Sequence, residues 1–140
     1  MIAWGPGRIP SARTSDQVWA LWDVLPTLAE LAGARPPDGI DGITMVASLT
    51  GRGRQRQHEY LYWEFYEEGS KQAVRMGWWK GVRQPMLTGK LELYDLKTDP
   101  GERHELSQRY PAISARLARL LDEAHTPSTV WRAPAEGSTR

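Results

Sequence analysis

The sequence contains no cysteine, and phenylalanine occurs only once among its aromatic residues. Without cysteine, the chain cannot form a disulfide, a thiolate metal site or a cysteine nucleophile. An excess of one charge is also missing, because 18 Lys and Arg residues face 17 Asp and Glu residues and leave a formal net charge of +1. This balance does not favour nucleic acid or an anionic membrane as a partner. No long apolar run indicates a signal peptide or a membrane span.

Tryptophan, in contrast, is abundant, with seven residues. Indole combines a large apolar area with one hydrogen-bond donor, so tryptophan suits protein cores and also surfaces that contact sugars. Burial is the commoner role. The 40% of hydrophobic residues is typical of a globular protein rather than a disordered one. A chain of 140 residues is long enough for a domain with a hydrophobic core.

Four short segments rich in aromatic and aliphatic residues predict an antiparallel meander in the middle of the chain. Strands joined by short turns usually pair with their neighbours in sequence. The four predicted strands comprise residues 60–66, 71–76, 78–83 and 91–96. Residues 67–70 predict a hairpin turn between the first two strands. After the last strand, the proline and glycine of Asp99-Pro100-Gly101-Glu102 predict a type II turn.

A C-terminal helix that covers the sheet is predicted to begin at Pro111. Its apolar residues recur at helical spacing and form one stripe, with charged residues mostly outside it. The stripe comprises Ile113, Leu117, Leu120, Leu121 and Ala124. Pro127 ends this helix, because proline does not continue a helix interior. We expect residues 127–140 to form a polar tail with Trp131 as its anchor.

The first residues of the chain predict less regular structure. Apolar residues 1–4 predict a strand stub that Gly5-Pro6-Gly7 breaks. Residues 17–22 fit a strand buried on both faces and also fit a helix, so the pattern leaves both open. Residues 43–49 predict one or two helical turns.

One longer helix is predicted in this first part. Proline is tolerated in the first helical turn but is costly in the interior, so Pro26 must lie close to the helix start. We therefore expect a helix over residues 24–32, with Asp23 as N-cap and Gly33 as C-terminal stop. Its expected buried stripe comprises Leu25, Leu28, Ala29 and Ala32.

Five stretches carry motifs that are weak alone but specific in their order and spacing. They are Ile2–Pro10, Asp23–Gly33, Asp38–Gly42, Lys71–Lys80 and Leu93–Glu102. They resemble, in turn, the Trp-Pro-Gly strand end, the D-x-x-P-T-x-x-x-x-x-G helix, the D-G-x-S loop, the A-V-R-x-G-x-W-K hairpin and the L-Y-D-L-x-x-D-P-x-E signature of sulfatases. The resemblance is to the C-terminal portion of the arylsulfatase type, in the alkaline phosphatase-like superfamily. Two departures are Gly5, which interrupts the Trp-Pro pair, and Thr44, which stands where serine is common.

The resemblance implies a fold in which a large α/β domain precedes a small antiparallel sheet covered by a helix. We therefore expect an α+β chain, with a four-stranded antiparallel sheet packed by a C-terminal helix. A strand-helix remnant of the large α/β sulfatase domain would precede the sheet. The expected divisions are residues 1–50 for this remnant, 51–126 for the sheet and helix, and 127–140 for the tail.

The resemblance also implies hydrolysis of sulfate esters or sulfamates, with a formylglycine nucleophile and a calcium ion. Formylglycine is made in a C/S-x-P-x-R motif, and Asp and Asn hold the cation, which neutralises charge on the transferring group. The sequence has no cysteine, no Ser-x-Pro-x-Arg and no Asp-Asp pair near its N-terminus. We therefore expect neither a cofactor nor catalytic or metal-binding residues in this chain, and no turnover by the chain alone.

The implied partners are a missing N-terminal sulfatase domain and, in the full enzyme, a sulfated carbohydrate or an aryl sulfate. Full-length relatives are often periplasmic, secreted or lysosomal, and the sequence leaves the location of this protein open. It also leaves open which sulfated substrate is used, O- versus N-sulfatase chemistry, and the oligomeric state.

In relatives, loops of the small sheet reach over the substrate cleft, so residues on and before the first two strands are candidates for a pocket wall. The candidate substrate-binding residues are His58, Trp63, Glu64, Lys71, Gln72 and Arg75. Lys71 and Arg75 would attract an anionic sugar, and Trp63 would stack on a sugar ring. In the structural alternative, Trp63 lies in the core, Arg75 pairs with Glu64 across the sheet, and His58 is a loop residue.

Two further functions stay open from the sequence. The chain could be a non-catalytic carbohydrate-binding module that uses its tryptophans as a stacking platform. It could also be an interaction module with an exposed apolar patch that once packed on the missing domain. The residues expected in that patch are Val18, Trp19, Leu21 and Trp22.

Overall fold

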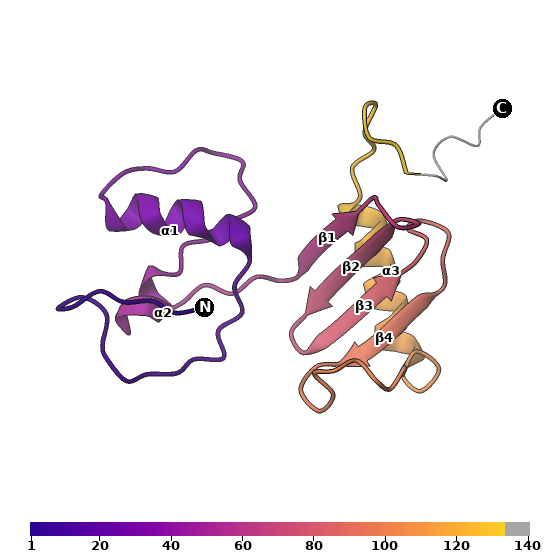
Figure 1. Ribbon diagram of the computed structural model, residues 1–140, viewed down its shortest axis with the longest axis horizontal. Coiled ribbons are helices and arrows are strands. Elements are labelled where there is room, and N and C mark those ends of the chain that lie inside the picture. The colour runs from indigo at the N-terminus through magenta and orange to yellow at the C-terminus, as the bar shows by residue number, and fades with distance from the viewer. Residues whose placement is uncertain (134–140) are drawn as a thin grey trace. The chain divides into compact units, whose positions relative to one another are not determined.

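The computed structural model describes residues 1–133 (Figure 1). The chain forms two compact units, Met1–His58 and Glu59–Arg140. Within the described residues, no helix is both long and apolar enough to cross a membrane.

The second unit is a four-stranded antiparallel sheet with the strand order β1-β2-β3-β4. The strands are β1 (Leu61–Phe65), β2 (Lys71–Met76), β3 (Trp79–Arg83) and β4 (Leu91–Asp95). The predicted meander is therefore confirmed, and three of its strands are shorter than the segments expected from the sequence. Register is well defined, with Trp63 opposite Ala73 in the first pair.

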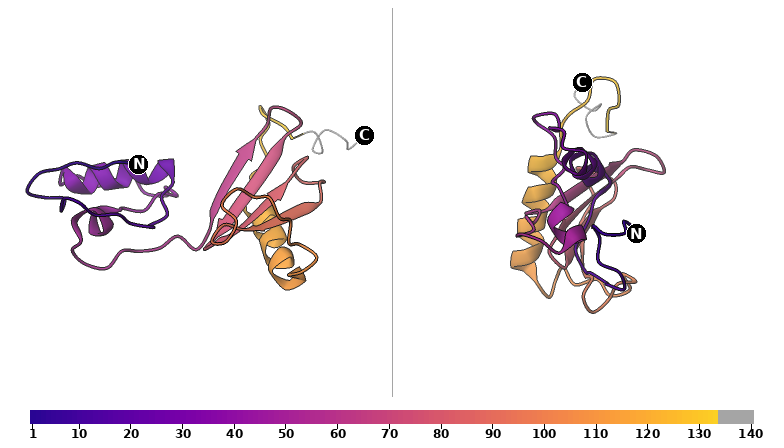
Figure 2. Two further views of the ribbon diagram at one scale, coloured as in Figure 1. Left: turned by 60° about the horizontal axis from the view of Figure 1, so that its bottom comes forward. Right: turned by 90° about the vertical axis from the view of Figure 1, so that its left-hand side faces the viewer.

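Helix α3 (Pro111–Ala124) covers one face of this sheet (Figure 2). Its apolar stripe faces the strands, and Leu117 and Leu121 are fully buried against Val74 of β2 and Leu93 of β4. Because strand side chains alternate between faces, the core is made by the helix-facing half of each strand. The prediction of a covering helix that starts at Pro111 is confirmed.

The close approach of α3 to the sheet depends on Gly81 in β3. A Cβ atom at this position would lie 3.2 Å from Cδ1 of Leu91 and 3.3 Å from Cβ and Cδ1 of Leu117. These neighbours belong to the packed core and have little room to move.

We expect Gly81→Val to lower the free energy of unfolding of the second unit by about 1–3 kcal/mol, the usual cost of overpacking. Gly101→Ala is the matched control, because a Cβ there would meet only the flexible Arg103 side chain, at 3.4 Å or more. Urea unfolding of the two variants measures the effect. Equal midpoints for both variants would contradict the close packing at Gly81.

Of the two predicted turns, the hairpin turn at residues 67–70 is confirmed, and the type II turn at residues 99–102 is not. In the β1–β2 hairpin, Glu68 and Gly69 have φ angles of 51° and 84°, and positive φ at both central positions matches the right-handed twist of paired strands. At residues 99–102, the Glu102 N–H donates to the Asp99 carbonyl at 3.2 Å. The positive φ there, 53°, belongs to Glu102 and not to Gly101, so the predicted type II turn is wrong.

Side-chain contacts explain this turn. Both carboxylate oxygens of Glu102 accept hydrogen bonds from Lys80 Nζ, at 2.6 and 2.8 Å. The Asp99 carboxylate accepts from the backbone N–H groups of Arg103 and His104 at 2.7 and 2.8 Å. These contacts fix a conformation that the proline and glycine alone do not specify.

Beyond α3, the expected anchoring role of Trp131 agrees with its ring contact to Tyr66. The two ring centroids lie 6.3 Å apart in an edge-to-face arrangement. Residues 134–140 of the predicted tail lie outside the described residues.

The first unit contains the 3-10 turn η1 (Leu21–Asp23), helix α1 (Val24–Leu31) and the short helix α2 (Val46–Thr50). The predicted helix start at Val24 and the helical turns near residues 43–49 are confirmed, and Gly33 has the left-handed φ of 71° expected after a helix end. The predicted strand stub at residues 1–4 is wrong, because these residues have no regular structure. Of residues 17–22, for which strand and helix both stayed open, 17–20 have no regular structure and 21–22 belong to η1. The structure has no strand within residues 1–58 to pair with them.

The predicted buried stripe of α1 is also wrong. Leu25 and Leu28 are 53% and 59% exposed, and Ala32 is exposed and Ala29 partly buried. Pro26 and Thr27 are buried instead. The cause is a set of hydrogen bonds on the polar side of the helix, which turns that side toward the interior of the unit.

Candidate functional site

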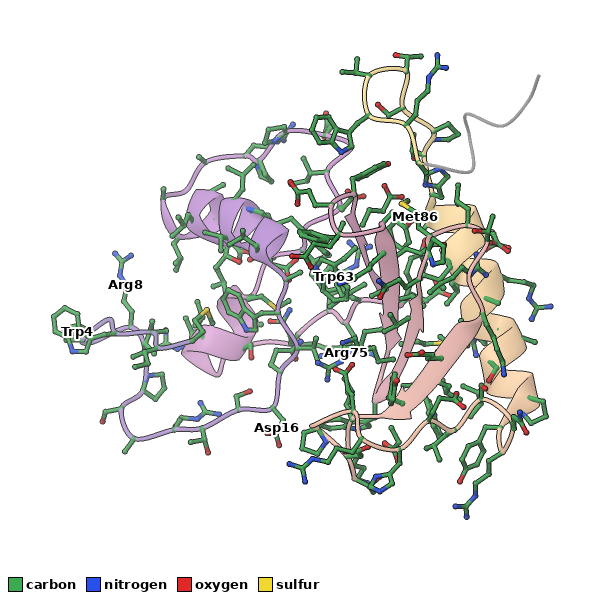
Figure 3. The ribbon with its side chains drawn as sticks, turned by 45° about the vertical axis from the view of Figure 1, so that its right-hand side comes forward. Trp4, Arg8, Asp16, Trp63, Arg75 and Met86 are labelled. Carbon is green, nitrogen blue, oxygen red and sulfur yellow. The ribbon has the colours of Figure 1, made fainter. Side chains whose placement is uncertain are left out.

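The face of the sheet that is turned away from α3 carries three of the six predicted site residues. We call it the open face. Trp63 of β1 and Lys71 and Arg75 of β2 lie on it, and Figure 3 shows Trp63 and Arg75 on the side opposite α3. Because Trp63 is paired with Ala73, it is the diagonal neighbour of both cations, at a spacing of about 7–8 Å between such positions.

Aromatic rings accompany both cations of the open face. Lys71 Nζ lies 6.0 Å from the ring centroid of Phe65, and the Arg75 guanidinium lies 5.7 Å from that of Trp78. Trp63, Phe65 and Trp78 are 38%, 45% and 44% exposed. Aromatic rings with cations at this distance are stabilised by cation–π attraction. We call Trp63, Phe65, Lys71, Arg75 and Trp78 the aromatic-cationic patch.

The cations of this patch are weakly neutralised. Lys71 Nζ lies 3.6 Å from Oε2 of Glu68, whose side chain is 78% exposed, so solvent screens this pair. Arg75 donates from Nε to the Gly77 carbonyl at 3.0 Å, and within residues 1–133 it forms no ion pair with a carboxylate. The alternative pairing of Arg75 with Glu64 is not formed, because the two side chains lie on opposite faces of the sheet.

Glu64, another predicted site residue, points to the helix side of the sheet. Its carboxylate accepts hydrogen bonds from the hydroxyls of Tyr62 and Tyr66, the latter at 2.7 Å, and lies 2.6 Å from Nδ1 of His125. Burial raises the pKa of Glu64, but the hydrogen bonds from Tyr62, His125 and Tyr66 outweigh burial and the net shift is downward. Burial, followed by the hydrogen bond to Glu64, raises the pKa of Tyr62 well above its ordinary value.

The lowered pKa of Glu64 predicts a pH-dependent contribution to stability. The ionised carboxylate is favoured in the folded state, so its contribution is present above the ordinary pKa near 4.5 and is lost as the pH falls through the lower folded pKa. We expect Glu64→Gln to be less stable than the wild type at pH 7, with the difference shrinking below pH 4.5. Thermal melts from pH 3 to pH 7, with exposed Glu67→Gln as control, measure this. A difference that grows toward acid would contradict it.

Gln72 is nearly inaccessible, at 1% exposure, and all of its hydrogen-bonding capacity is used. Its amide nitrogen donates to the Tyr62 hydroxyl at 3.0 Å and the Leu121 carbonyl at 3.3 Å. Its amide oxygen accepts from the Leu87 N–H at 2.8 Å and from Arg83 at 3.2 Å. Gln72 thus connects β2 with α3 and with the loop after β3.

His58 belongs to the first unit, where its Nε2 lies 2.8 and 3.0 Å from the two carboxylate oxygens of Asp23. The Asp23 side chain is completely buried, and the His58 side chain is 11% exposed. His58 therefore has a charged partner that the sequence did not indicate.

Two members of the aromatic-cationic patch were missed by sequence reasoning. Phe65 was recoverable, since strand alternation places it on the same face as Trp63. Trp78 lies in the turn between β2 and β3, and its approach to Arg75 depends on the geometry of that turn, which begins at the positive-φ Gly77. No simple periodicity in the sequence indicates this contact.

The candidate site was also searched for metal ligands among its neighbouring residues. Within residues 1–133, no three His, Cys, Asp or Glu side chains are grouped so that they could hold a metal ion. The calcium that the resemblance implies thus has no ligand set in this part, and we assign no step through a metal to these residues. The chemical groups that the patch does present are exposed aromatic rings and two cations.

Comparisons with known proteins agree on one family. The protein-family model described as "N-sulphoglucosamine sulphohydrolase, C-terminal" matches residues 1–126. The chain is 36% identical over 112 residues to a Delta 4,5-hexuronate-2-O-sulfatase of Bacteroides thetaiotaomicron, covering 76% of this chain and 23% of the relative. It is 30% identical over 145 residues to arylsulfatase A of Bos taurus, covering 87% and 28%.

Solved structures give the same result. A putative sulfatase from Bacteroides thetaiotaomicron superposes with a TM-score of 0.65 and 35% sequence identity, over 72% of this chain and 23% of that protein. The chain thus spans about a quarter of the length of the relatives it matches.

Proposed function

Because this chain belongs to the sulfatase family and matches its C-terminal part, we propose that it is the C-terminal portion of a hydrolase of sulfate esters on sugars. In this role its sheet contributes structure and a wall of the substrate pocket. The catalytic centre lies in another portion of the enzyme. His58, Glu64 and Gln72, named from the sequence, stay candidates, but the proposal rests on the open face.

The observation that carries the proposal is the aromatic-cationic patch. A sulfated sugar presents an apolar ring face and a charged group, and the patch presents an indole between two cations. Arg75 offers a planar donor fork suited to an oxyanion, and Lys71 offers a point charge. Trp63 supplies the apolar surface for the ring. Two relatives carry names that indicate sulfated sugars as substrates. They are a hexuronate-2-O-sulfatase and an N-acetylgalactosamine-6-sulfatase.

The sequence supports this division of roles between the two portions of the enzyme. The family's nucleophile, formylglycine, provides the attacking oxygen when present, and this chain contains no C/S-x-P-x-R motif from which it is made. The residues of this chain bind the sugar and fix its orientation relative to that centre. Orientation is a large part of catalysis, since a well-placed reactant avoids the entropy cost of a bimolecular encounter.

We expect Trp63→Ala and Arg75→Ala each to weaken binding of a 2-O-sulfated uronate disaccharide about tenfold, or about 1.4 kcal/mol. Removing the stacking surface or the anion-binding fork accounts for these losses. Titration calorimetry on the whole chain measures them, with the unsulfated disaccharide as ligand control.

Arg116→Ala is the protein control, since Arg116 is an exposed arginine on α3. Equal weakening by all three substitutions would indicate non-specific attraction and contradict the patch. Binding that ignores sulfation would contradict the assigned substrate class.

A second candidate is a carbohydrate-binding module without hydrolysis. The exposure of Trp63 and Phe65 on one face favours it, because two exposed rings on a sheet resemble a stacking surface. The two functions differ in one outcome. A module binds unsulfated glycans as well as sulfated ones, whereas a sulfatase pocket wall requires the anion.

A further inference from the structure

The first unit contains a cavity of about 730 Å³ whose lining is cationic. Two parts of the chain form it, the loop over residues 3–13 and the end of α2 with the residues that follow. Among the described residues, the charged side chains of the lining are all arginines, and no Asp or Glu is present. We call this cavity the arginine pocket. Its three arginines are Arg8, Arg13 and Arg52.

The charges of these arginines are not neutralised by neighbouring side chains. All three residues are exposed, and within residues 1–133 none of their guanidinium groups forms an ion pair with a carboxylate. A concave surface lined by one sign of charge focuses the electric field and raises the local concentration of the opposite ion. The arginine pocket therefore attracts anions more strongly than scattered surface arginines do.

A glycine leaves the space that the Arg13 guanidinium occupies. Gly51 follows α2 with a φ of 70°, and its N–H donates to the Ala47 carbonyl at 2.9 Å. A Cβ atom at Gly51 would overlap Nη1 of Arg13 and displace the guanidinium. Glycine at this position thus serves both the left-handed end of the helix and the close approach of the arginine.

Local hydrogen bonds fix the backbone that carries the other two arginines. The N–H groups of Arg8 and Ile9 donate to the Gly5 carbonyl at 3.1 and 2.7 Å and close a tight turn. The N–H of Arg52 donates to the Thr50 hydroxyl at 3.3 Å. These bonds use backbone donors, so the guanidinium groups of Arg8 and Arg52 are available to a ligand.

We infer that the arginine pocket binds a free tetrahedral oxyanion and prefers sulfate to phosphate. A guanidinium group presents parallel N–H donors that match two oxygens of such an anion. Sulfate is fully ionised near neutral pH and only accepts hydrogen bonds, whereas phosphate at pH 6 carries O–H groups that need acceptors. The lining contains no carboxylate to accept them. The pocket shares no residue with the aromatic-cationic patch, so this inference does not rest on the proposed function.

Nuclear magnetic resonance of the whole chain labelled with nitrogen-15 tests this site at its own residues. Sodium sulfate is titrated at pH 6 and constant ionic strength, and the backbone N–H signals of Arg8 and Gly51 are followed. We expect both signals to shift along one saturating curve, with phosphate at least about fivefold weaker because its O–H groups stay unpaired. Arg8→Gln and Arg13→Gln should each weaken sulfate binding at least about fivefold, since each removes a charge and a donor fork.

Arg35→Gln is the matched control, because Arg35 is an exposed arginine of the same unit outside the lining and its replacement changes the net charge equally. Trp63→Ala should leave sulfate affinity unchanged, which separates this site from the proposed function. Shifts that stay linear, or that sodium chloride reproduces, would overturn the site. Equal weakening by Arg35→Gln and Arg13→Gln would also overturn it, since attraction would then depend on net charge alone. Equal affinities for sulfate and phosphate would overturn the preference.

Discussion

Replacing Asp23 with alanine is expected to remove most of the stability of the first unit. This completely buried carboxylate accepts from two backbone N–H groups and contacts His58. The variant leaves the backbone N–H groups of Ala20 and Ile43 without an acceptor. Each buried group that loses its partner costs about 1–3 kcal/mol, so we expect a loss of about 2–6 kcal/mol.

Hydrogen exchange of the Ile43 amide is the most local measurement of this loss. We expect its protection to fall by at least about a hundredfold in Asp23→Ala, since each 1.4 kcal/mol corresponds to a factor of ten. Asp16→Ala is the control, because Asp16 is exposed. Unchanged protection in Asp23→Ala would mean that this carboxylate does not hold the unit together.

The second large effect is expected from Leu117→Ala in α3. Leu117 is fully buried against Val74 and Leu93, and its replacement leaves a cavity between helix and sheet. Substitutions of this type cost about 2–5 kcal/mol. Because Gly81 holds the sheet close to Leu117, the neighbouring atoms have little freedom to fill the space, and we expect a loss toward the upper end.

Urea denaturation followed by far-ultraviolet circular dichroism measures the effect. Val130→Ala serves as control, because Val130 is 88% exposed and its truncation removes little buried area. A cost below about 1 kcal/mol for Leu117→Ala would show that α3 does not pack on the sheet as described.

The meander and its covering helix followed from the sequence because local signals and tertiary packing agree there. Alternating strands, a proline at Pro111 and a stripe centred on Leu117 and Leu121 all require the same layer arrangement. Such agreement between levels is what makes a fold readable from one sequence.

The buried side of α1 and the contacts of the first unit were predicted less well from the sequence, because these contacts are long-range and polar. Helix periodicity in α1 correctly located the helix but assigned its interior to the wrong side. Asp23 is the N-cap residue of α1, as expected, but its carboxylate bonds to Ala20, Ile43 and His58 and makes no capping bond to the helix. A buried carboxylate with partners 20 and 35 residues away leaves no periodic trace in the sequence.

The three site residues on the open face were predictable from the alternation of side chains along a strand. Trp63, Lys71 and Arg75 share one face because of strand alternation and register. The same alternation placed Glu64 on the other face, but the partnership of Glu64 with His125 required the end of α3 to meet β1. That meeting is a property of the packed unit.

The most direct test of the proposed function is the release of inorganic sulfate from sulfated disaccharides. The assay uses the 140-residue chain alone and the chain combined with the Bacteroides hexuronate-2-O-sulfatase from which the matched C-terminal segment has been removed. We predict no release by the chain alone, release by the combination, and a higher KM for the combination when Trp63 or Arg75 is replaced by alanine. Sulfate release by the purified chain alone would contradict the claim that its residues recognise the substrate while another portion of the enzyme performs the chemistry.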